Sequence, residues 1–60
     1  MGKTFTDLKG KRYRAENYNG VDVDRDIITD DVTNYYACYD GEPLVEISKE
    51  VYEALEKYYQ

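Results

Sequence analysis

The dipeptide Asp40-Gly41 constrains the fold of this chain more than any other feature of its sequence. It lies between two segments rich in β-forming residues, 32–39 and 42–47. Asp-Gly between such segments is typical of a type I′ turn that joins two antiparallel strands. The sequence therefore predicts a β-hairpin in which Tyr39 pairs with Glu42. Regular alternation from that pair puts Tyr36 and Cys38 beside Val45 and Ile47 on one face, and Tyr35, Ala37, Tyr39 and Leu44 on the other.

A second turn signal, Asn19-Gly20, lies between two alternating segments, residues 11–17 and 21–27. A two-residue loop at this point would put charged side chains on the apolar face of the hairpin, whereas a three-residue loop keeps that face mostly apolar. The hydrophobic pattern therefore favours the three-residue loop. In that register the apolar face carries Val21, Val23 and Ile27, and the outer face pairs Arg14 with Asp24 and Arg12 with Asp26.

The C-terminal segment, from residue 49 to about residue 59, has the spacing of an amphipathic helix. Its apolar face carries Val51, Leu55 and Tyr58, and Ser48 precedes it as the residue that caps the first turn. Strands followed by a single helix, without alternation of strand and helix, indicate the α+β class. We therefore predict an antiparallel sheet of three to four strands, built from two hairpins, with one C-terminal helix on one face.

We expect all 60 residues to form one small domain, because the sequence contains no internal repeat and no Pro/Ser-rich linker. Residues 1–4 are expected to be frayed, as chain ends commonly are. Thr6 is expected to cap a single helical turn that ends at Gly10, with Phe5 and Leu8 packed against the core.

The chain has no His, one Ser and one Cys. It therefore lacks the residues for a Ser-His-Asp or Cys-His nucleophile, for a His-ligated metal and for acid–base catalysis by imidazole. Asp22, Asp24 and Asp26 have the spacing with which a calcium-binding loop begins, but Ile27 stands where that loop needs Gly, and Thr33 where it needs Glu. We expect a protein that is not an enzyme and that binds neither a cofactor nor a metal.

Charge is unevenly distributed along the chain. Residues 1–14 carry five basic side chains and one acidic, whereas residues 15–60 carry three basic and twelve acidic, and the net charge is -5. An acidic surface of this kind repels nucleic acid and attracts basic partners. We therefore expect a host protein with a basic surface as the partner, rather than naked nucleic acid. The sequence shows neither a secretion signal nor an apolar stretch that could span a membrane, so we expect a cytoplasmic location.

Three side chains are candidates for the anchor that contacts this partner: Tyr35, Tyr39 and Leu44. If the helix covers the other face of the sheet, nothing in this chain covers these residues, and exposed apolar patches are frequent contact sites. The acidic residues expected around the anchor are Asp30, Asp31, Asp40, Glu42 and Glu46. Two other interpretations remain open: the acidic residues only keep the protein in solution, and the tyrosines only stabilise the sheet through cross-strand pairs.

A different site is offered by the basic residues Lys9, Lys11, Arg12 and Arg14. Basic side chains at such a spacing can contact phosphates, so the alternative function is that of a small nucleic-acid-associated accessory protein of a mobile element. A homodimer joined through the exposed tyrosine face is a third possibility.

The segment YDGEPLVEISKEVYEAL, from Tyr39 to Leu55, resembles the hairpin-then-helix opening of small proteins carried by phages and mobile elements. In size and in its acidic, Tyr-rich composition the chain is also similar to phage-encoded anti-defence inhibitors, including anti-CRISPR and anti-restriction proteins. The resemblance implies an inhibitor of the anti-defence type.

The residues themselves point to a non-enzymatic protein-binding module. Alternate Asp residues on one face of a strand lie about 6.6 Å apart, a spacing comparable with that of successive phosphates along DNA. Because Arg12 and Arg14 are expected to pair with two of these Asp residues, the row alone is a weak mimic of DNA, and the broader acidic surface with Asp30, Asp31, Asp40, Glu42 and Glu46 is the better one. We therefore expect the module to occupy a basic, nucleic-acid-binding surface on a host protein.

Overall fold

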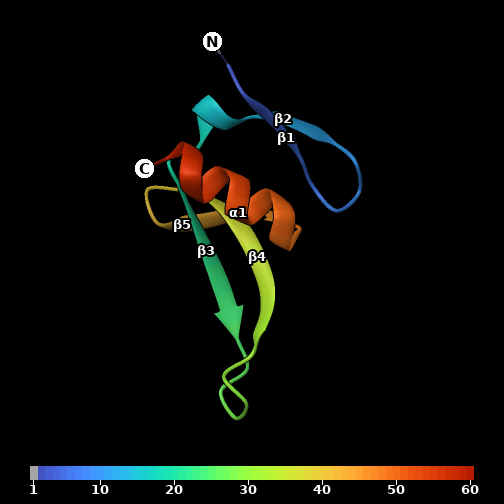
Figure 1. Ribbon diagram of the computed structural model, residues 1–60, viewed down its shortest axis with the longest axis vertical. Helices are drawn as coiled ribbons and strands as arrows, with labels where there is room; N and C mark the ends of the chain where they lie inside the picture. Colours follow the sequence, from blue (N-terminus) through green and yellow to red (C-terminus); the bar gives the residue numbers. More distant parts are fainter. Residues whose placement is uncertain (1) are drawn as a thin grey trace.

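The strands of the chain form two separate antiparallel sheets, and one helix packs against the larger of them (Figure 1). This computed structural model describes residues 2–60. The elements in chain order are β1 (Thr4–Thr6), β2 (Arg12–Arg14), the 3-10 turn η1 (Ala15–Asn17), β3 (Gly20–Arg25), β4 (Val32–Tyr39), β5 (Glu42–Ile47) and α1 (Lys49–Tyr58). β1 pairs with β2, and the other sheet has the order β3-β4-β5. The predicted α+β class, with one C-terminal helix, is confirmed.

The hairpin of β4 and β5 forms as the sequence predicts. Tyr39 pairs with Glu42, and the two residues between them, Asp40 and Gly41, have φ angles of 51° and 81°. Positive φ at both central residues defines the type I′ turn, and Gly41 adopts it without the steric cost of a Cβ atom.

β5 contains a β-bulge at Leu44. Cys38 pairs with Pro43 and Ala37 pairs with Val45, so Leu44 is an extra residue on its strand. One extra residue moves every following side chain to the opposite face of the sheet. The predicted partition of the two faces is therefore wrong beyond the turn. The residues that share the face toward the helix are Tyr35, Ala37, Val45 and Ile47, and not Tyr36 and Cys38.

The predicted hairpin around Asn19-Gly20 is wrong, because β2 pairs with β1 and β3 pairs with β4. Between β2 and β3 the fully buried Ala15 begins η1, which closes with a hydrogen bond from the N–H of Tyr18 to the carbonyl of Ala15 at 3.1 Å. The N–H of Asn19 then donates to the carbonyl of Cys38 and starts the pairing with β4. Arg14 lies opposite Thr4 and Arg12 opposite Thr6, rather than opposite Asp24 and Asp26.

Pairing with β4 gives β3 a covered apolar face. Val21 lies opposite Ala37 and Val23 opposite Tyr35, on the side of the sheet that the helix covers. Pairing with β4 therefore partly buries Val21 and Val23, the valines that the predicted hairpin would have placed on its apolar face. Ile27 does not join them, because β3 ends at Arg25.

The β1–β2 connection is a hairpin turn organised by Asp7, and the predicted helical turn capped by Thr6 is wrong. The carboxylate of Asp7 accepts hydrogen bonds from the N–H groups of Lys9 at 2.8 Å and Lys11 at 3.0 Å, and from the hydroxyl of Tyr13 at 2.8 Å. Gly10 lies in this turn with φ of 86°, a conformation that favours glycine. The bond from Tyr13, with those from the two N–H groups, lowers the pKa of Asp7.

Two side chains near this turn test the expected packing of the N-terminal segment. Phe5 is buried, as expected, and its ring stacks on Tyr13 at 5.4 Å between centroids. Leu8 is exposed, contrary to expectation. The expected fraying of residues 1–4 includes Met1, which lies outside the described residues. The carbonyl of Lys3 accepts a hydrogen bond from the N–H of Ala15 at 2.7 Å, and β1 begins at Thr4.

The helix begins and ends close to the predicted positions. The Oγ of Ser48 accepts a hydrogen bond from the N–H of Val51 at 3.2 Å, which confirms the cap. Leu55 is fully buried, whereas Tyr58, predicted on the same face, is exposed. Tyr59 takes its place against the core, and its hydroxyl donates to the carbonyl of Ala15 at 2.7 Å.

One hydrophobic cluster joins the two sheets and the helix. Its buried members are Phe5, Ala15, Ala37, Val45, Ile47 and Leu55. Cys38 is buried outside this cluster, and burial raises the pKa of its thiol. Within residues 2–60, none of the helical structure is long and apolar enough to cross a lipid bilayer.

The bond from Tyr59 to Ala15 can be tested by Tyr59→Phe, which removes only the hydroxyl. The variant leaves a buried carbonyl with one partner fewer, so the free energy of unfolding should fall by about 1 kcal/mol. Tyr58→Phe is the matched control, because that side chain is exposed, and its free energy of unfolding should change by less than about 0.5 kcal/mol. Urea denaturation of both variants measures the difference; equal stabilities would contradict this role of the hydroxyl.

Candidate functional site

The residues expected to form one partner site are spread along the hairpin of β4 and β5 (Figure 1), with Tyr35 and Glu46 in its middle and the others toward its two ends. Asp30 and Asp31 precede β4 in the loop that joins it to β3, whereas Tyr39 ends it and Asp40 follows. At about 3.3 Å per residue, the seven steps from Val32 to Tyr39 separate the ends of β4 by roughly 23 Å. The structure therefore does not bring all of the predicted residues together as one site. Tyr39 lies beside Asp40 and Glu42, and Leu44 shares a cavity with Glu46, whereas Asp30 and Asp31 lie at the far end of β4.

Tyr35 lies under the helix. Its ring centroid is 5.1 Å from that of Tyr52, and the side chain packs against the hydrophobic cluster. The expectation that nothing in the chain covers Tyr35 is wrong, because the bulge at Leu44 reverses the faces of the hairpin. Tyr39 and Leu44 are exposed by 50% and 54%, as expected.

Leu44 and Tyr39 belong to different parts of the surface. Leu44 lines a cavity of about 300 Å³ with Leu8, between the β1–β2 turn and β5, and Tyr39 is not part of its lining. Asp40, next to Tyr39, is fastened to Asn19 by two bonds: its Oδ1 accepts from the side-chain amide at 2.9 Å, and its N–H donates to the side-chain oxygen at 2.8 Å. The carboxylate of Asp40 therefore helps to hold the β4–β5 turn against Asn19.

The basic residues of the alternative site are all exposed on the β1–β2 hairpin. Lys9 and Lys11 lie in and after its turn, and the ammonium of Lys11 lies 5.5 Å from the centroid of the Tyr13 ring. Arg12 and Arg14 alternate on β2, opposite Thr6 and Thr4. These guanidinium groups therefore belong to a different hairpin from the acidic residues of β3.

The outer side of the three-stranded sheet, opposite the helix, carries Asp22, Asp24 and Glu46, which we call the acidic face. The cross-strand register places Asp22 beside Tyr36, and Tyr36 beside Glu46. The hydroxyl of Tyr36 donates to the carboxylate of Asp24 at 3.0 Å, and this bond raises the pKa of Tyr36. Glu46 accepts a bond from the side-chain amide of Asn34 at 2.6 Å. Glu42 is exposed nearer the β4–β5 turn.

The loop of residues 26–31, which we call the hairpin tip, ends a hairpin that projects away from the rest of the molecule (Figure 1). The projection makes the molecule 41 Å long but only 23 and 18 Å across. Ile27 and Ile28 lie in the hairpin tip, and each is 93% exposed. Sequence reasoning missed this pair because Ile27 continues the alternation of Val21 and Val23. The signal that could have revealed it is two adjacent apolar residues enclosed by Asp.

Hydrogen bonds hold the hairpin tip in one conformation. The Oδ1 of Asp26 accepts from the N–H groups of Ile28 at 2.8 Å and Thr29 at 3.1 Å. The N–H of Asp26 donates to the carbonyl of Asp31 at 2.9 Å, and that of Asp30 donates to the carbonyl of Asp26 at 2.8 Å. Asp30 has φ of 62°, a left-handed conformation that Asp tolerates better than most residues. The two isoleucines are therefore presented by an ordered turn.

The charge of the hairpin tip is strongly negative. The bonds from the N–H groups of Thr29 and Ile28 lower the pKa of Asp26, so its carboxylate is ionised well below neutral pH. Asp30 and Asp31 are exposed beside it. The guanidinium of Arg25 donates to the carbonyl of Asp30 at 3.1 Å. The positive charge of Arg25 therefore lies against the backbone of the hairpin tip.

The three Asp residues that resemble the start of a calcium-binding loop do not surround a common point. Asp22 and Asp24 lie along the extended strand β3, and the carboxylate of Asp26 binds backbone N–H groups of the hairpin tip. Within residues 2–60, no group of three or more His, Cys, Asp or Glu side chains is placed to hold a metal ion.

Comparison of the chain with protein-family models, with curated proteins and with solved structures gives no match.

Proposed function

We propose that this protein is a non-enzymatic binding module that docks on a basic surface of a partner protein through the hairpin tip and the acidic face. The observation that carries the proposal is the exposure of Ile27 and Ile28, 93% each, at the apex of an ordered hairpin. Burial of an isoleucine side chain against a partner contributes about 1.5 to 3 kcal/mol. Two such side chains, which are exposed to water before binding, can therefore supply much of the affinity for a partner.

The order of the hairpin tip supports this role. Association costs free energy whenever a flexible loop must be fixed in its bound conformation. Here the carboxylate of Asp26 already fixes the N–H groups of Ile28 and Thr29. Insertion of Ile27 and Ile28 into a recess of the partner would therefore cost little conformational entropy of the loop.

The charges around the apex favour a basic partner. Five carboxylates and one guanidinium lie between Asp22 and Asp31, and the guanidinium, that of Arg25, is bonded to the loop itself. Complementary charge accelerates encounter and excludes acidic surfaces, whereas apolar burial slows dissociation. The preferred partner surface is thus an apolar recess with Lys and Arg around its rim.

A basic surface of this kind is typical of proteins that bind nucleic acid, and the acidic face supports an inhibitor that competes for it. Asp22 and Asp24 lie on the same face of β3, about 6.6 Å apart along the strand, a spacing comparable with that of successive phosphates. Arg12 and Arg14 lie on β2, so neither is opposite these carboxylates. Occupation of the basic surface would exclude the nucleic acid that normally binds there.

The anchor is tested by Ile27→Ser and Ile28→Ser. Each substitution removes an apolar contact from the interface but none from the core, so binding to a captured partner should weaken roughly ten- to hundred-fold, while the free energy of unfolding stays unchanged. Tyr39→Ala, at the other end of β4, is the matched control for loss of an exposed apolar side chain, and it should retain the binding of the wild-type protein.

Affinity capture from a lysate, followed by titration of the purified partner, measures these effects. Retention of full binding by the double isoleucine variant would show that the hairpin tip is not the anchor, and loss of binding with Tyr39→Ala would move the anchor to the β4–β5 turn. A salt-dependent gel shift of the protein alone with DNA or RNA would instead favour the basic residues Lys9, Lys11, Arg12 and Arg14.

The order of the hairpin tip should depend on pH through Asp26. Its pKa is lower in the folded protein than the ordinary value of 3.8, so its bonds stabilise the loop above that value and are lost as pH falls through the lower, folded pKa. In an NMR titration, the amide protons of Ile28 and Thr29 should therefore shift together, with a midpoint below that ordinary value.

Two variants separate the charge of Asp26 from its role as a hydrogen-bond acceptor. Asp26→Asn keeps an oxygen acceptor without a titrating proton, so the loop should stay ordered and the titration should disappear. Asp26→Ala removes the acceptor, so the amide of Ile28 should exchange faster with solvent. An unchanged exchange rate in Asp26→Ala would contradict the role assigned to this carboxylate.

A further inference from the structure

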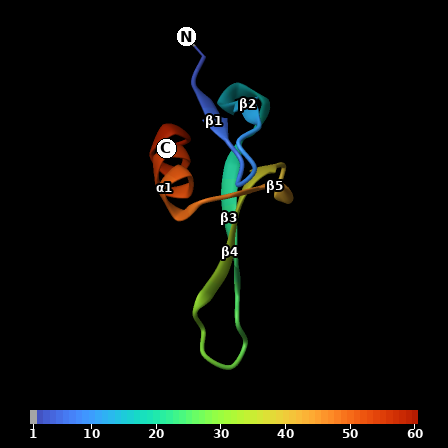
Figure 2. The same ribbon diagram turned by 90° about the vertical axis from the view of Figure 1, so that its right-hand side faces the viewer.

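We propose that the free edge of β1, with the groove between β1 and α1, is a second binding site that takes an extended acidic peptide as an added β-strand. This site goes beyond the proposed function, because it lies on the β1–β2 hairpin rather than at the hairpin tip. Figure 2 shows β1 between β2 and α1, so one edge of β1 pairs with β2 and the other faces the helix.

The groove has an apolar floor of a size that suits a peptide. It forms a cavity of about 360 Å³, and its floor consists of Phe5 from β1 and Val51, Ala54 and Leu55 from α1. Ligand pockets in proteins commonly have volumes of about 300 to 1,000 Å³ and mostly apolar linings. Every second side chain of an added strand would point to one side and could occupy this floor.

The backbone of β1 supplies groups that a strand could bind. Lys3 accepts from the N–H of Ala15, and Asp7 donates its N–H to the carbonyl of Lys11. Alternation between these two bonds directs the N–H and carbonyl of Phe5 toward β2, and those of Thr4 and Thr6 away from it. Thr4 and Thr6 both line the groove, so their backbone groups lie where a peptide strand would pair with them.

The charge of the groove selects an acidic peptide. Its lining includes Lys3 and Arg12 and, among the described residues, no carboxylate. This is a basic site on a protein of net charge -5, and it therefore differs in sign from the hairpin tip. An acidic strand gains attraction from both cations, whereas the unpaired backbone edge alone would accept any sequence.

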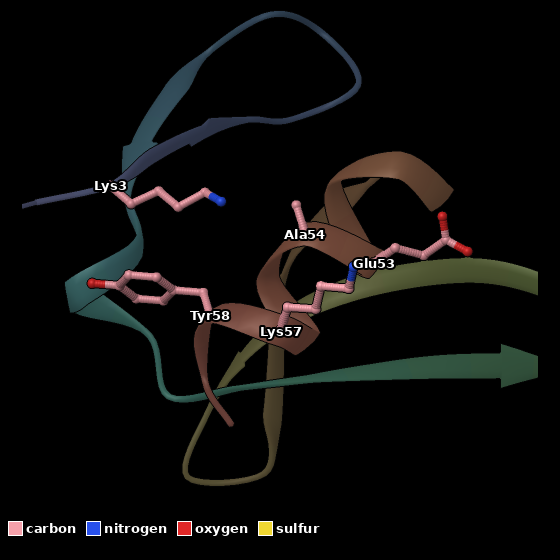
Figure 3. Close-up of a pocket in the computed structure, with 5 residues that line it drawn as sticks. All are labelled: Lys3, Glu53, Ala54, Lys57 and Tyr58. Atoms are coloured by element: carbon pink, nitrogen blue, oxygen red, sulfur yellow. The ribbon is translucent and has the colours of Figure 1, made fainter.

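A second cavity, of about 420 Å³, continues the groove along the helix and shares Lys3 and Ala54 with it. Figure 3 shows Lys3, the residue before β1, reaching toward the helix, with Ala54 facing it and the carboxylate of Glu53 directed away. The ammonium of Lys3 lies 5.9 Å from the centroid of the Tyr58 ring. Lys57 adds a further cation to this lining, which contains two Lys residues and one acidic residue, Glu53, so an acidic peptide longer than β1 would meet a net positive charge beyond the strand.

The test uses the full chain and a synthetic six-residue peptide of alternating glutamate and valine, with both ends blocked. Two further peptides carry N-methyl groups on alternate residues, in complementary sets, so that each loses the N–H donors of one edge. An added strand pairs through one edge only. The unmodified peptide should therefore bind, one methylated peptide should lose binding and the other should keep it. The amide protons of Thr4 and Thr6 should shift downfield on binding.

Arg12→Glu reverses one charge of the groove, and Arg14→Glu is the matched control, because Arg14 lies on the same face of β2 but does not line the cavity. Both side chains are exposed, so both variants should fold. Arg12→Glu should weaken binding of the peptide about three- to ten-fold, and Arg14→Glu less than two-fold.

Four outcomes would overturn the proposal. They are no binding of the acidic peptide at millimolar concentration, equal binding of the two methylated peptides, equal effects of the two Arg variants, and equal binding of a peptide with lysine in place of glutamate. Sedimentation of the protein alone provides a further check. A dimer that dissociates with Thr6→Pro, which removes an N–H from the free edge, would assign the edge to a second copy instead.

Discussion

The buried peptide of Ala15 is the connection on which the rest of the structure depends. Its N–H donates to the carbonyl of Lys3 at 2.7 Å, and its carbonyl accepts from the hydroxyl of Tyr59 at 2.7 Å and from the N–H of Tyr18 at 3.1 Å. These bonds join β1, the end of α1 and the turn that leads into β3. A domain of 60 residues buries little apolar surface, so it cannot leave such a peptide unpaired, at a cost of about 1 to 3 kcal/mol. The bonds of this one residue therefore hold Lys3, Tyr18 and Tyr59 beside the core that the two sheets and the helix share.

The parts of the fold that the sequence predicted are those decided within a few residues. Asp40-Gly41 sets a turn through its own φ angles, and Ser48 caps a helix through one bond to Val51. Asn19-Gly20 is an equally strong local signal, but it failed because the choice between β2 and β4 as partner of β3 depends on contacts distant in the chain. The bulge at Leu44 could not be predicted from the sequence for another reason. Either register puts apolar side chains beside Val45 and Ile47, so the hydrophobic pattern alone could not distinguish the two faces.

The sequence indicated the acidic residues of the candidate site but not its exposed isoleucines, and the difference has a physical cause. Asp30 and Asp31 could be identified as surface acids because charge alone indicates exposure. Ile27 and Ile28 could not be identified as exposed, because Ile27 extends the alternation of the valines in β3 and apolar residues are expected in the core. The strand stops because the carboxylate of Asp26 binds the N–H groups of Ile28 and Thr29 and so competes with the ladder. Exposed isoleucines promote aggregation, and the surrounding Asp residues oppose it by charge repulsion. The free protein can therefore expose these two side chains to water.

The two proposed sites are stabilised by different parts of the molecule, and this determines how they can act together. The hairpin tip is held by bonds within residues 25–31, whereas the floor of the groove consists of Phe5 and Leu55, members of the hydrophobic cluster. Coupling between distant sites requires an element with two arrangements that both ligands bias. β3 and β4 connect the hairpin tip to the core as one ladder, with a register shift between Asp24 and Arg25 next to the tip, and the structure contains one arrangement of it. A ligand at the groove should therefore leave the affinity of the hairpin tip unchanged, so the two proposed sites would bind independently of each other.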